Sequence, residues 1–174
     1  MSTTDQELLE TIVTMMKAER WAEVIAVAES RLAEDSPSHE LLWNVGWAHF
    51  KLEQYDQAVS YLRKANDGGP VKASFYASLG FAYYELKNYI MAELWLHRAL
   101  AMRDDSLTRL SLTLVYLRQD LVEIAEAVHK EGIRLKPDSR ERLEGYADFL
   151  CDVGRDEEAK KLYEVAEKIS FNKS

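Results

Sequence analysis

The chain has 174 residues and a formal net charge of −8, from 22 Lys and Arg against 30 Asp and Glu. Basic residues drive binding to phosphate backbones and to anionic lipid, so this composition sets nucleic acid and membrane surfaces aside as main partners. Hydrophobic residues make up 47% of the chain, with only 7 glycines and 3 prolines. Such a composition favours a folded, helical protein over a disordered or strand-rich one.

The start of the chain and its cysteine content bear on the cellular compartment. Cys151 is the only cysteine, so no disulfide can form within the chain. The first positive charge is Lys17, after three acidic residues, whereas a secretory signal begins with basic residues and continues with an apolar run. No apolar run approaches the ~18 residues of a membrane span. We therefore expect a cytoplasmic protein.

Residues 5–38 are predicted to form a first, degenerate pair of helices. Apolar residues recur at helical spacing from Leu8 to Met16, and Trp21 opens a second apolar stretch after a short turn. Trp21 lies 34 positions before Tyr55, which begins the corresponding stretch of the next unit. The dipeptide Ser36-Pro37 is predicted to restart the chain as the start of another helix.

Residues 39–72 and 73–105 are predicted to be two copies of one unit. Gly46 and Gly80 are 34 positions apart. The same offset separates four further pairs of identical residues, namely Tyr55 and Tyr89, Ala58 and Ala92, Leu62 and Leu96, and Ala65 and Ala99. A period of this length indicates a helix–turn–helix repeat, and residues 67–70 (Asp-Gly-Gly-Pro) are predicted to end the first copy.

Two further units follow at 106–139 and 140–174. Tyr83 and Tyr116 are 33 positions apart, so the fourth unit lacks one residue near Asp104, and Gly132 takes the place of Ala99. Ala125 and Ala159 are again 34 positions apart. No unit can bury its apolar face alone, so neighbours stack around a continuous core. We expect an all-α protein in which residues 1–174 form a single domain of about five repeats.

The repeats resemble those of the tetratricopeptide repeat (TPR) family. The third repeat carries the family's landmark residues at Leu79, Gly80, Tyr83, Ala92 and Ala99, with Tyr76 in the place of Trp and Leu96 in the place of Phe. The resemblance implies a right-handed superhelical solenoid of antiparallel helix pairs, whose first helices line a concave groove. It also implies binding of another protein or peptide.

The first helix of each repeat has a second stripe of residues, which falls at the family's groove positions. It comprises Leu9, Val13 and Met16, then Trp43, Trp47 and Phe50, then Ala77, Phe81 and Tyr84, then Leu110, Leu114 and Leu117. In the fifth repeat the stripe changes to Glu144, Asp148 and Cys151. Contiguous exposed apolar patches mark interaction sites, and aromatic residues dominate their energetics. We expect a non-catalytic adaptor or scaffold that binds an apolar or amphipathic segment in this groove.

Polar residues beside the stripe bear on which ligand it would take. Lys17, Lys51 and Arg118 lie one residue beyond the stripe and are predicted to pair with acidic residues of a ligand. Some TPR proteins clamp a terminal carboxylate with Lys and Asn side chains, but only Asn44 fits that role here. The resemblance therefore argues against carboxylate clamping.

Two alternative functions remain open. The chain is similar in size, charge and groove character to the small acidic TPR chaperones of type III secretion, which hold a hydrophobic client. Alternatively, the stripe is covered by the N-terminal repeat or by a second copy in a homodimer, and the chain is a self-associating assembly subunit.

The sequence offers no pattern of a catalytic, metal or cofactor site. None of the four histidines is paired with another at i+3 or i+4, and no His/Cys cluster has zinc spacing. No phosphate-binding glycine loop and no nucleophile elbow occur. His97 and His129 are predicted to lie between helices as structural residues, and nearby carboxylates are expected to make Cys151 a poor nucleophile. We expect no enzyme activity and no cofactor.

Overall fold

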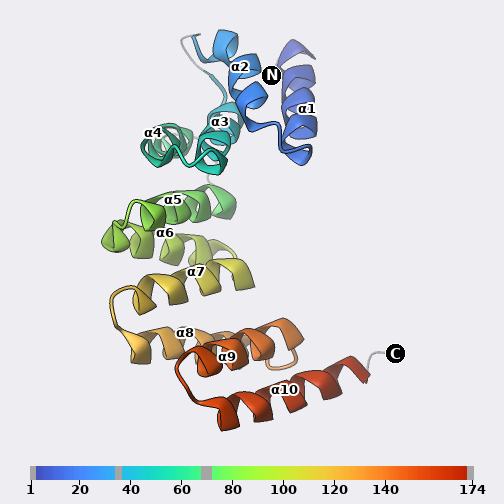
Figure 1. Ribbon diagram of the computed structural model, residues 1–174. Coiled ribbons are helices and arrows are strands. Elements are labelled where there is room, and N and C mark those ends of the chain that lie inside the picture. The colour runs from blue at the N-terminus through green and yellow to red at the C-terminus, as the bar shows by residue number, and fades with distance from the viewer. Residues whose placement is uncertain (1–2, 34–36, 68–71, 172–174) are drawn as a thin grey trace. The chain divides into compact units, whose positions relative to one another are not determined.

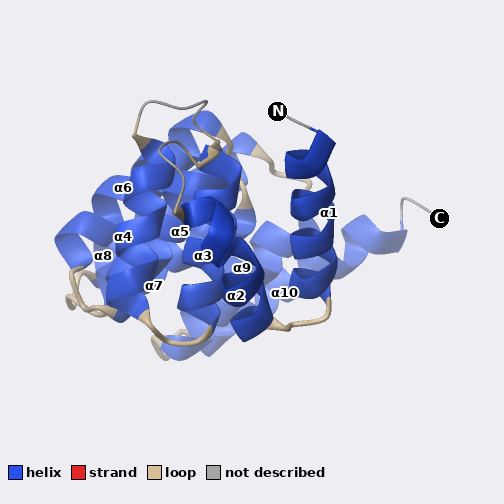
Figure 2. Ribbon diagram, turned by 90° about the horizontal axis from the view of Figure 1, so that it is seen from above, coloured by secondary structure: helices blue, strands red, loops and turns tan. Residues whose placement is uncertain are grey.

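The computed structural model describes residues 3–33, 37–67 and 72–171, which form ten α-helices and no strand (Figures 1 and 2). The chain divides into two compact units, Met1–Met102 and Arg103–Ser174. The division falls at the end of the third predicted repeat, where the fourth repeat lacks one residue. The all-α class is confirmed, and a single domain over residues 1–174 stays a prediction.

The N-terminal unit is a stack of three helix pairs. Its helices are α1 (Thr3–Lys17), α2 (Trp21–Leu32), α3 (His39–Lys51), α4 (Tyr55–Asn66), α5 (Ala73–Glu85) and α6 (Tyr89–Met102). From α1 to α6 each helix packs against the next, and α3 also contacts both α1 and α5. The first helices of the three repeats therefore lie beside one another.

The C-terminal unit contains two further pairs. Its helices are α7 (Ser106–Leu117), α8 (Val122–Leu135), α9 (Arg140–Asp152) and α10 (Asp156–Phe171). Again each helix packs against the next, and α7 contacts α9. Each of the five predicted repeats thus holds one helix pair, as the 34-residue period indicated.

The predicted break between the first two repeats is placed differently in the structure. Helix α3 begins at His39 rather than at Pro37, because the Ser38 hydroxyl accepts a hydrogen bond from the backbone N–H of Leu41 (3.2 Å) and caps the helix. Ser36 lies outside the described residues, as do residues 68–70 of the predicted break after the second repeat.

The turns within the five pairs are built alike. One residue in each has a left-handed backbone, with φ between 56° and 77°: Glu19, Glu53, Lys87, Asp120 and Gly154. The next residue's N–H then reaches back to the carbonyl five positions earlier, at distances of 2.7–3.0 Å. This bond satisfies a carbonyl that the end of a helix leaves unpaired. The spacing of these five residues reproduces the repeat period, including the shortened step in the fourth repeat.

The glycines of the second and third repeats set how closely the two helices of a pair approach. A Cβ built on Gly46 would lie 2.8 Å from Cγ of Leu62, and one built on Gly80 would lie 2.6 Å from Cγ of Leu96. Both leucines are fully buried. Each leucine therefore occupies the space that any larger residue on the facing helix would need.

Replacing Gly80 with Ala is expected to lower the free energy of unfolding by about 1–3 kcal/mol, because the added methyl group overpacks the contact with Leu96. Urea denaturation followed by far-ultraviolet circular dichroism measures the change. Gly145→Ala is the matched control, since a Cβ there meets nothing within 4 Å. It is expected to be neutral or to stabilise by about 0.4–1 kcal/mol. Equal effects of the two substitutions would contradict this account of Gly80.

Candidate functional site

A run of stacked aromatic rings crosses from α3 to α5 in the N-terminal unit. Trp47 lies at its centre. The centroid of its ring is 4.9 Å from that of Phe50, 6.2 Å from that of Trp43 and 6.3 Å from that of Phe81. Trp43 also stacks on Phe75 at 5.5 Å. We call these five residues the aromatic face. Four of them are half-buried, so each presents part of its ring outward while the other part packs on a neighbour.

Trp43 is held in place by a chain of hydrogen bonds. Its indole Nε1–H donates to the Ser78 hydroxyl (3.1 Å), and that hydroxyl donates to the backbone carbonyl of Ser74 (2.8 Å). Phe75, beneath the indole, is only 2% exposed. The sequence stripe did not include Phe75 or Ser78, because both lie outside the groove positions of α5. The structure shows that they fix the orientation of Trp43, so the aromatic face is preorganised.

The other predicted groove residues of the N-terminal unit differ in their exposure. On α1, Val13 is 43% exposed, whereas Leu9 and Met16 are half-buried against the core. Asn44 is 3% exposed and Ala77 is 8% exposed, so neither offers much surface to a ligand.

The remaining predicted residues lie towards the C-terminal ends of the same helices. Tyr84 is half-buried and its ring lies 6.0 Å from that of Tyr89. Lys17 and Lys51 are exposed, and the Lys51 ammonium lies 5.6 Å from the centroid of the Trp21 ring. Lys51 therefore already has a cation–π partner on α2.

In the C-terminal unit the predicted stripe lines a pocket of about 390 Å³. Leu110, Leu114 and Leu117 form one side of it, and Leu110 and Leu114 are 47% and 38% exposed. Helix α9 forms the other side with the carboxylates of Glu141, Glu144, Asp148 and Asp152. Arg118 and Cys151 are exposed but do not line the pocket. The structure thus brings the apolar stripe of the fourth repeat and the acidic stripe of the fifth repeat to one site.

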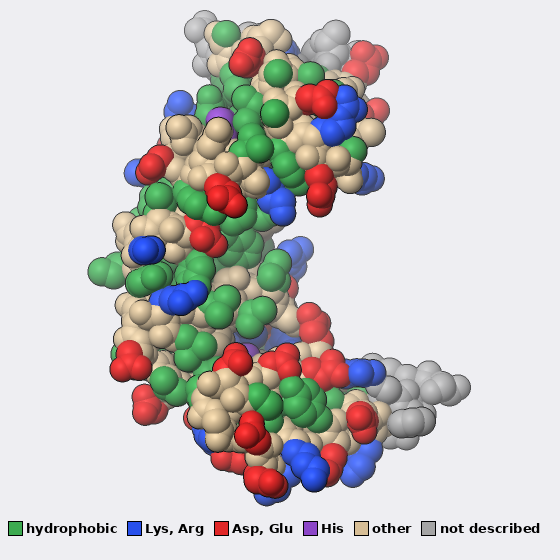
Figure 3. Space-filling view, in the orientation of Figure 1, with side chains coloured by type: hydrophobic (Ala, Val, Ile, Leu, Met, Phe, Trp, Pro, Cys, Tyr) green, Lys and Arg blue, Asp and Glu red, His purple; other side chains and the backbone are tan. Residues whose placement is uncertain are grey.

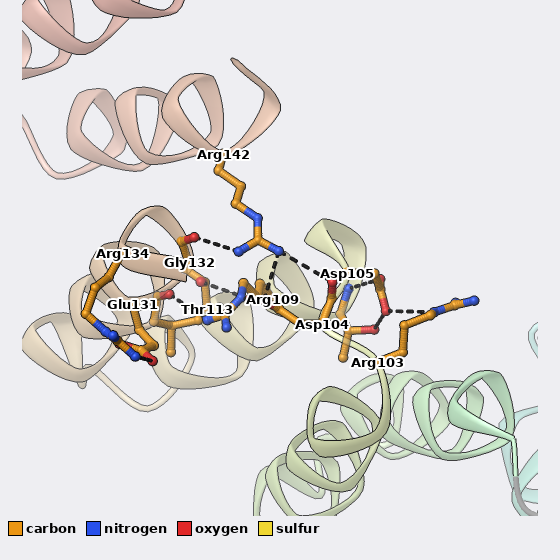
Figure 4. A network of polar contacts seen from close by, with 11 residues as sticks. Arg103, Asp104, Asp105, Arg109, Thr113, Glu131, Gly132, Arg134 and Arg142 are labelled. Atoms are coloured by element: carbon orange, nitrogen blue, oxygen red, sulfur yellow. Dashed lines mark hydrogen bonds and ion pairs between the residues drawn. The ribbon is translucent and has the colours of Figure 1, made fainter. Parts of the chain in front are cut away.

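The half-buried Arg109 and the buried Arg142 line this pocket, and Figure 4 shows the polar network that they form. Arg109 donates to Asp104 (2.6 Å) and to the carbonyl of Val128 (3.0 Å). Arg142 donates to the carbonyl of Gly132 (2.6 Å) and pairs with Asp104 at 3.0 Å. Burial opposes the charge of Asp104, but hydrogen bonds from the two guanidinium groups outweigh it and hold the pKa of this carboxyl below its ordinary value.

Gly132 explains how the arginines fit. A Cβ at this position would lie 3.1 Å from Cδ of Arg109, which is closer than an ordinary contact. The sequence showed that Gly132 replaces the small residue of the other repeats, and the structure gives the reason. The Arg109 side chain occupies the space that Ala99 fills in the third repeat.

A buried threonine–histidine pair forms the floor of the pocket. His129 Nε2 lies 3.2 Å from the Thr113 hydroxyl, and the His129 ring packs 5.0 Å from Phe149 and 5.6 Å from Tyr146. Burial, together with the nearby positive charge of Arg109, lowers the pKa of His129 to about 4. The imidazole is therefore neutral at pH 7, and it lies between helices as the sequence predicted. The same prediction is wrong for His97, which is exposed on α6.

A second polar cluster joins α8 to α9 and to the turn before α10. Glu126 accepts a hydrogen bond from the Tyr146 hydroxyl (2.5 Å) and pairs with Lys130 (2.8 Å) and Arg155 (2.9 Å). Its bonds to Lys130 and Tyr146 are the main causes that lower the pKa of Glu126 to about 2. This cluster links the two repeats of the unit and lies outside the pocket.

In the described residues no group of three or more His, Cys, Asp or Glu side chains is arranged to hold a metal ion. No described helix is both long enough and apolar enough to cross a membrane.

Comparison with known proteins gives one family. Residues 39–67 and 73–103 each match a model of the tetratricopeptide repeat. A search of curated proteins found no match.

Solved structures resemble the chain along most of its length. A crystal structure of MamA protein has a TM-score of 0.75 at 20% identity, over 99% of this chain and 95% of that one. The MamA RS-1 ArsTM double mutant has a TM-score of 0.76 at 15% identity, over 100% and 98% of the two chains. YrrB, described as a TPR protein with an unusual peptide-binding site, has a TM-score of 0.68 at 16% identity, over 93% and 84%. At these identities the likeness shows the fold.

The histidine in the pocket floor predicts a pH dependence of stability. The unfolded chain binds a proton at His129 near pH 6.5, whereas the folded chain does so only near pH 4. The contribution of His129 to the free energy of unfolding is therefore complete above pH 6.5 and is lost as the pH falls towards 4. We expect a loss of about 2–3 kcal/mol between pH 7 and pH 4.5.

Urea denaturation across this pH range compares the wild type with His129→Leu. Leucine is the matched replacement, because Leu62 and Leu96 occupy the equivalent positions of the second and third repeats. The variant is expected to lose most of the pH dependence between 6.5 and 5.5, where carboxyl groups with ordinary pKa values stay almost fully ionised. A wild type and a variant with the same slope would contradict a buried, neutral His129.

Proposed function

We propose that this chain, a tetratricopeptide repeat protein by its two matching repeats and its fold, is a protein–protein interaction module whose aromatic face binds an apolar or amphipathic segment of a partner protein. The observation that carries the proposal is the contact of the Trp47 ring with Trp43, Phe50 and Phe81, at centroid separations of 4.9–6.3 Å. Half-buried aromatic residues of this kind supply large contact areas at low cost in conformational entropy.

The hydrogen bonds around Trp43 support the proposal. A side chain already fixed in one orientation loses little conformational freedom when a ligand covers it, so more of the contact energy appears as affinity. The chain of bonds from Trp43 through Ser78 to the backbone provides such preorganisation. The description of YrrB as a TPR protein with a peptide-binding site also agrees with binding of a peptide segment by this fold.

We propose a non-catalytic role as an adaptor or scaffold in the cytoplasm. Val13, Tyr84 and Lys51 of the N-terminal unit would extend the contact beyond the aromatic face. No observation singles out the secretion-chaperone role, which stays a prediction. Coverage by a second copy of the chain is the alternative that the experiment below must separate from binding of a different protein.

The test is a pull-down from native lysate with wild type and with Trp47→Ala/Phe81→Ala, analysed by mass spectrometry. We expect recovery of a specific partner to fall at least about tenfold in the variant, because truncation of an aromatic hot spot costs about 2 kcal/mol or more. The matched control is Ile90→Ala/Leu94→Ala, which removes two exposed apolar side chains from α6.

Circular dichroism and light scattering complete the test. Both variants should keep the helical content of the wild type. Loss of the partner from both variants alike, or from neither, would contradict binding at the aromatic face. A wild-type dimer that becomes a monomer only in the Trp47/Phe81 variant, without any lost partner, would instead assign the face to self-association.

A further inference from the structure

The pocket of the C-terminal unit has two chemically different walls. We call it the amphipathic pocket, with an apolar wall of Leu110, Leu114 and Leu117 on α7 and an acidic wall of Glu141, Glu144, Asp148 and Asp152 on α9. The leucines are spaced at i, i+4 and i+7 and the carboxylates at i, i+3, i+7 and i+11, so each set follows one face of its helix. The helices that carry the two walls are in contact.

The charge of the acidic wall is only partly neutralised from within the chain. Glu144 pairs with Arg140 at 2.6 Å, and Asp148 accepts a hydrogen bond from the neutral hydroxyl of Tyr163. No ion pair is formed by Asp148 or Asp152 in the part of the chain that the structure describes. In Figure 3 acidic side chains lie side by side over the C-terminal helices. Like charges four residues apart on a helix repel one another, so a bound cation would relieve this repulsion.

The two arginines at the pocket supply only part of the missing positive charge. Arg109 and Arg142 are largely buried and share the single carboxylate of Asp104, so this group keeps one net positive charge against the four carboxylates of α9. The floor is neutral, because Thr113, Phe149 and the uncharged His129 form it. The field that a ligand meets at the mouth of the pocket therefore comes mainly from the carboxylates of α9.

The pocket also has room for a side chain. Its volume of about 390 Å³ lies within the range of ~300–1,000 Å³ that is common for ligand pockets. Gly145 lies on the α9 side, and a Cβ there would meet no atom within 4 Å, so the wall is open at this point between Glu141 and Asp148.

We infer that the amphipathic pocket binds a basic amphipathic segment of a partner protein, with an apolar side chain against the leucines and a neighbouring lysine or arginine against Asp148 and Asp152. This inference rests on the proposed function in that the chain binds protein segments, and it adds the class of ligand that the C-terminal unit selects. Charge complementarity identifies the occupant: an acidic segment would be repelled by the α9 wall, and an uncharged one would leave those carboxylates unpaired.

Two synthetic peptides of about 14 residues, nearly four helical turns, provide the probes. The first has leucines on one helical face and lysines on the other, and the second has glutamate in place of every lysine. Each carries a fluorescein label, and fluorescence anisotropy with the full chain measures its Kd. We expect the lysine peptide to bind at least about tenfold more tightly than the glutamate peptide, with a preference that weakens as salt is added.

Variants locate the binding. Asp148→Asn/Asp152→Asn keeps side-chain size and an acceptor for Tyr163 but removes two charges, and should weaken the lysine peptide about tenfold or more. The matched control is Glu157→Gln/Glu164→Gln, which removes two exposed charges from α10 outside the pocket and should leave Kd within about twofold. Leu110→Ala/Leu114→Ala removes most of the apolar wall and should also raise the Kd of the lysine peptide.

The outcomes separate this inference from the proposed function. Binding of the lysine peptide that survives in Trp47→Ala/Phe81→Ala and is lost in Asp148→Asn/Asp152→Asn supports the amphipathic pocket whatever the aromatic face does. Binding lost only in the Trp47/Phe81 variant overturns the inference while the aromatic face stands. Equal binding of both peptides, equal loss in the α10 control, or no binding of the lysine peptide also overturns it.

Discussion

The contact between a glycine on the first helix and a buried leucine on the second is the constraint on which the second and third repeats depend. A Cβ at Gly46 or Gly80 would approach the facing leucine to within 2.8 or 2.6 Å, so the pair of residues acts as one packing unit. This close approach directs one face of α3 and α5 into their partner helices. It leaves the neighbouring face, with Trp43, Trp47 and Phe81, half-buried and available for stacking.

In the fourth repeat two polar residues replace the glycine and the leucine at the contact between the two helices. Thr113 and His129 occupy the positions of the glycine and the leucine, and the Thr113 hydroxyl faces the imidazole at 3.2 Å. A buried polar pair is stable only if its hydrogen bonds are satisfied, and the Thr113 hydroxyl also donates to the carbonyl of Arg109 (3.1 Å). Gly132 in turn makes room for the Arg109 side chain. The amphipathic pocket lies directly over this polar floor.

Much of the fold could be predicted from the sequence, because helix pairs, their period and the missing residue of the fourth repeat all follow from residue type and spacing. The turns are an exception, because their residue type does not mark them. The residue with a left-handed backbone recurs at the same position of all five turns, but only Gly154 among the five is a glycine. Contacts that depend on side-chain direction could not be predicted. Phe75 and Ser78 lie off the stripe yet fix Trp43, whereas Asn44, beside the stripe, is buried. Arg109 of α7 and Arg142 of α9 meet at Asp104, in the loop before α7, and no local pattern connects them.

The two surfaces differ in the force that would drive binding, and this difference has a consequence for selectivity. The proposed aromatic face would act through removal of apolar surface from water, which depends little on salt and discriminates weakly between apolar sequences. The acidic wall of α9 would act through charge, which disfavours segments of the same sign. The net charge of −8 adds a long-range field of the same sign, so basic segments are favoured during approach as well as at contact. In such an arrangement shape and apolar area provide affinity, and Asp148 and Asp152 provide the choice between partners.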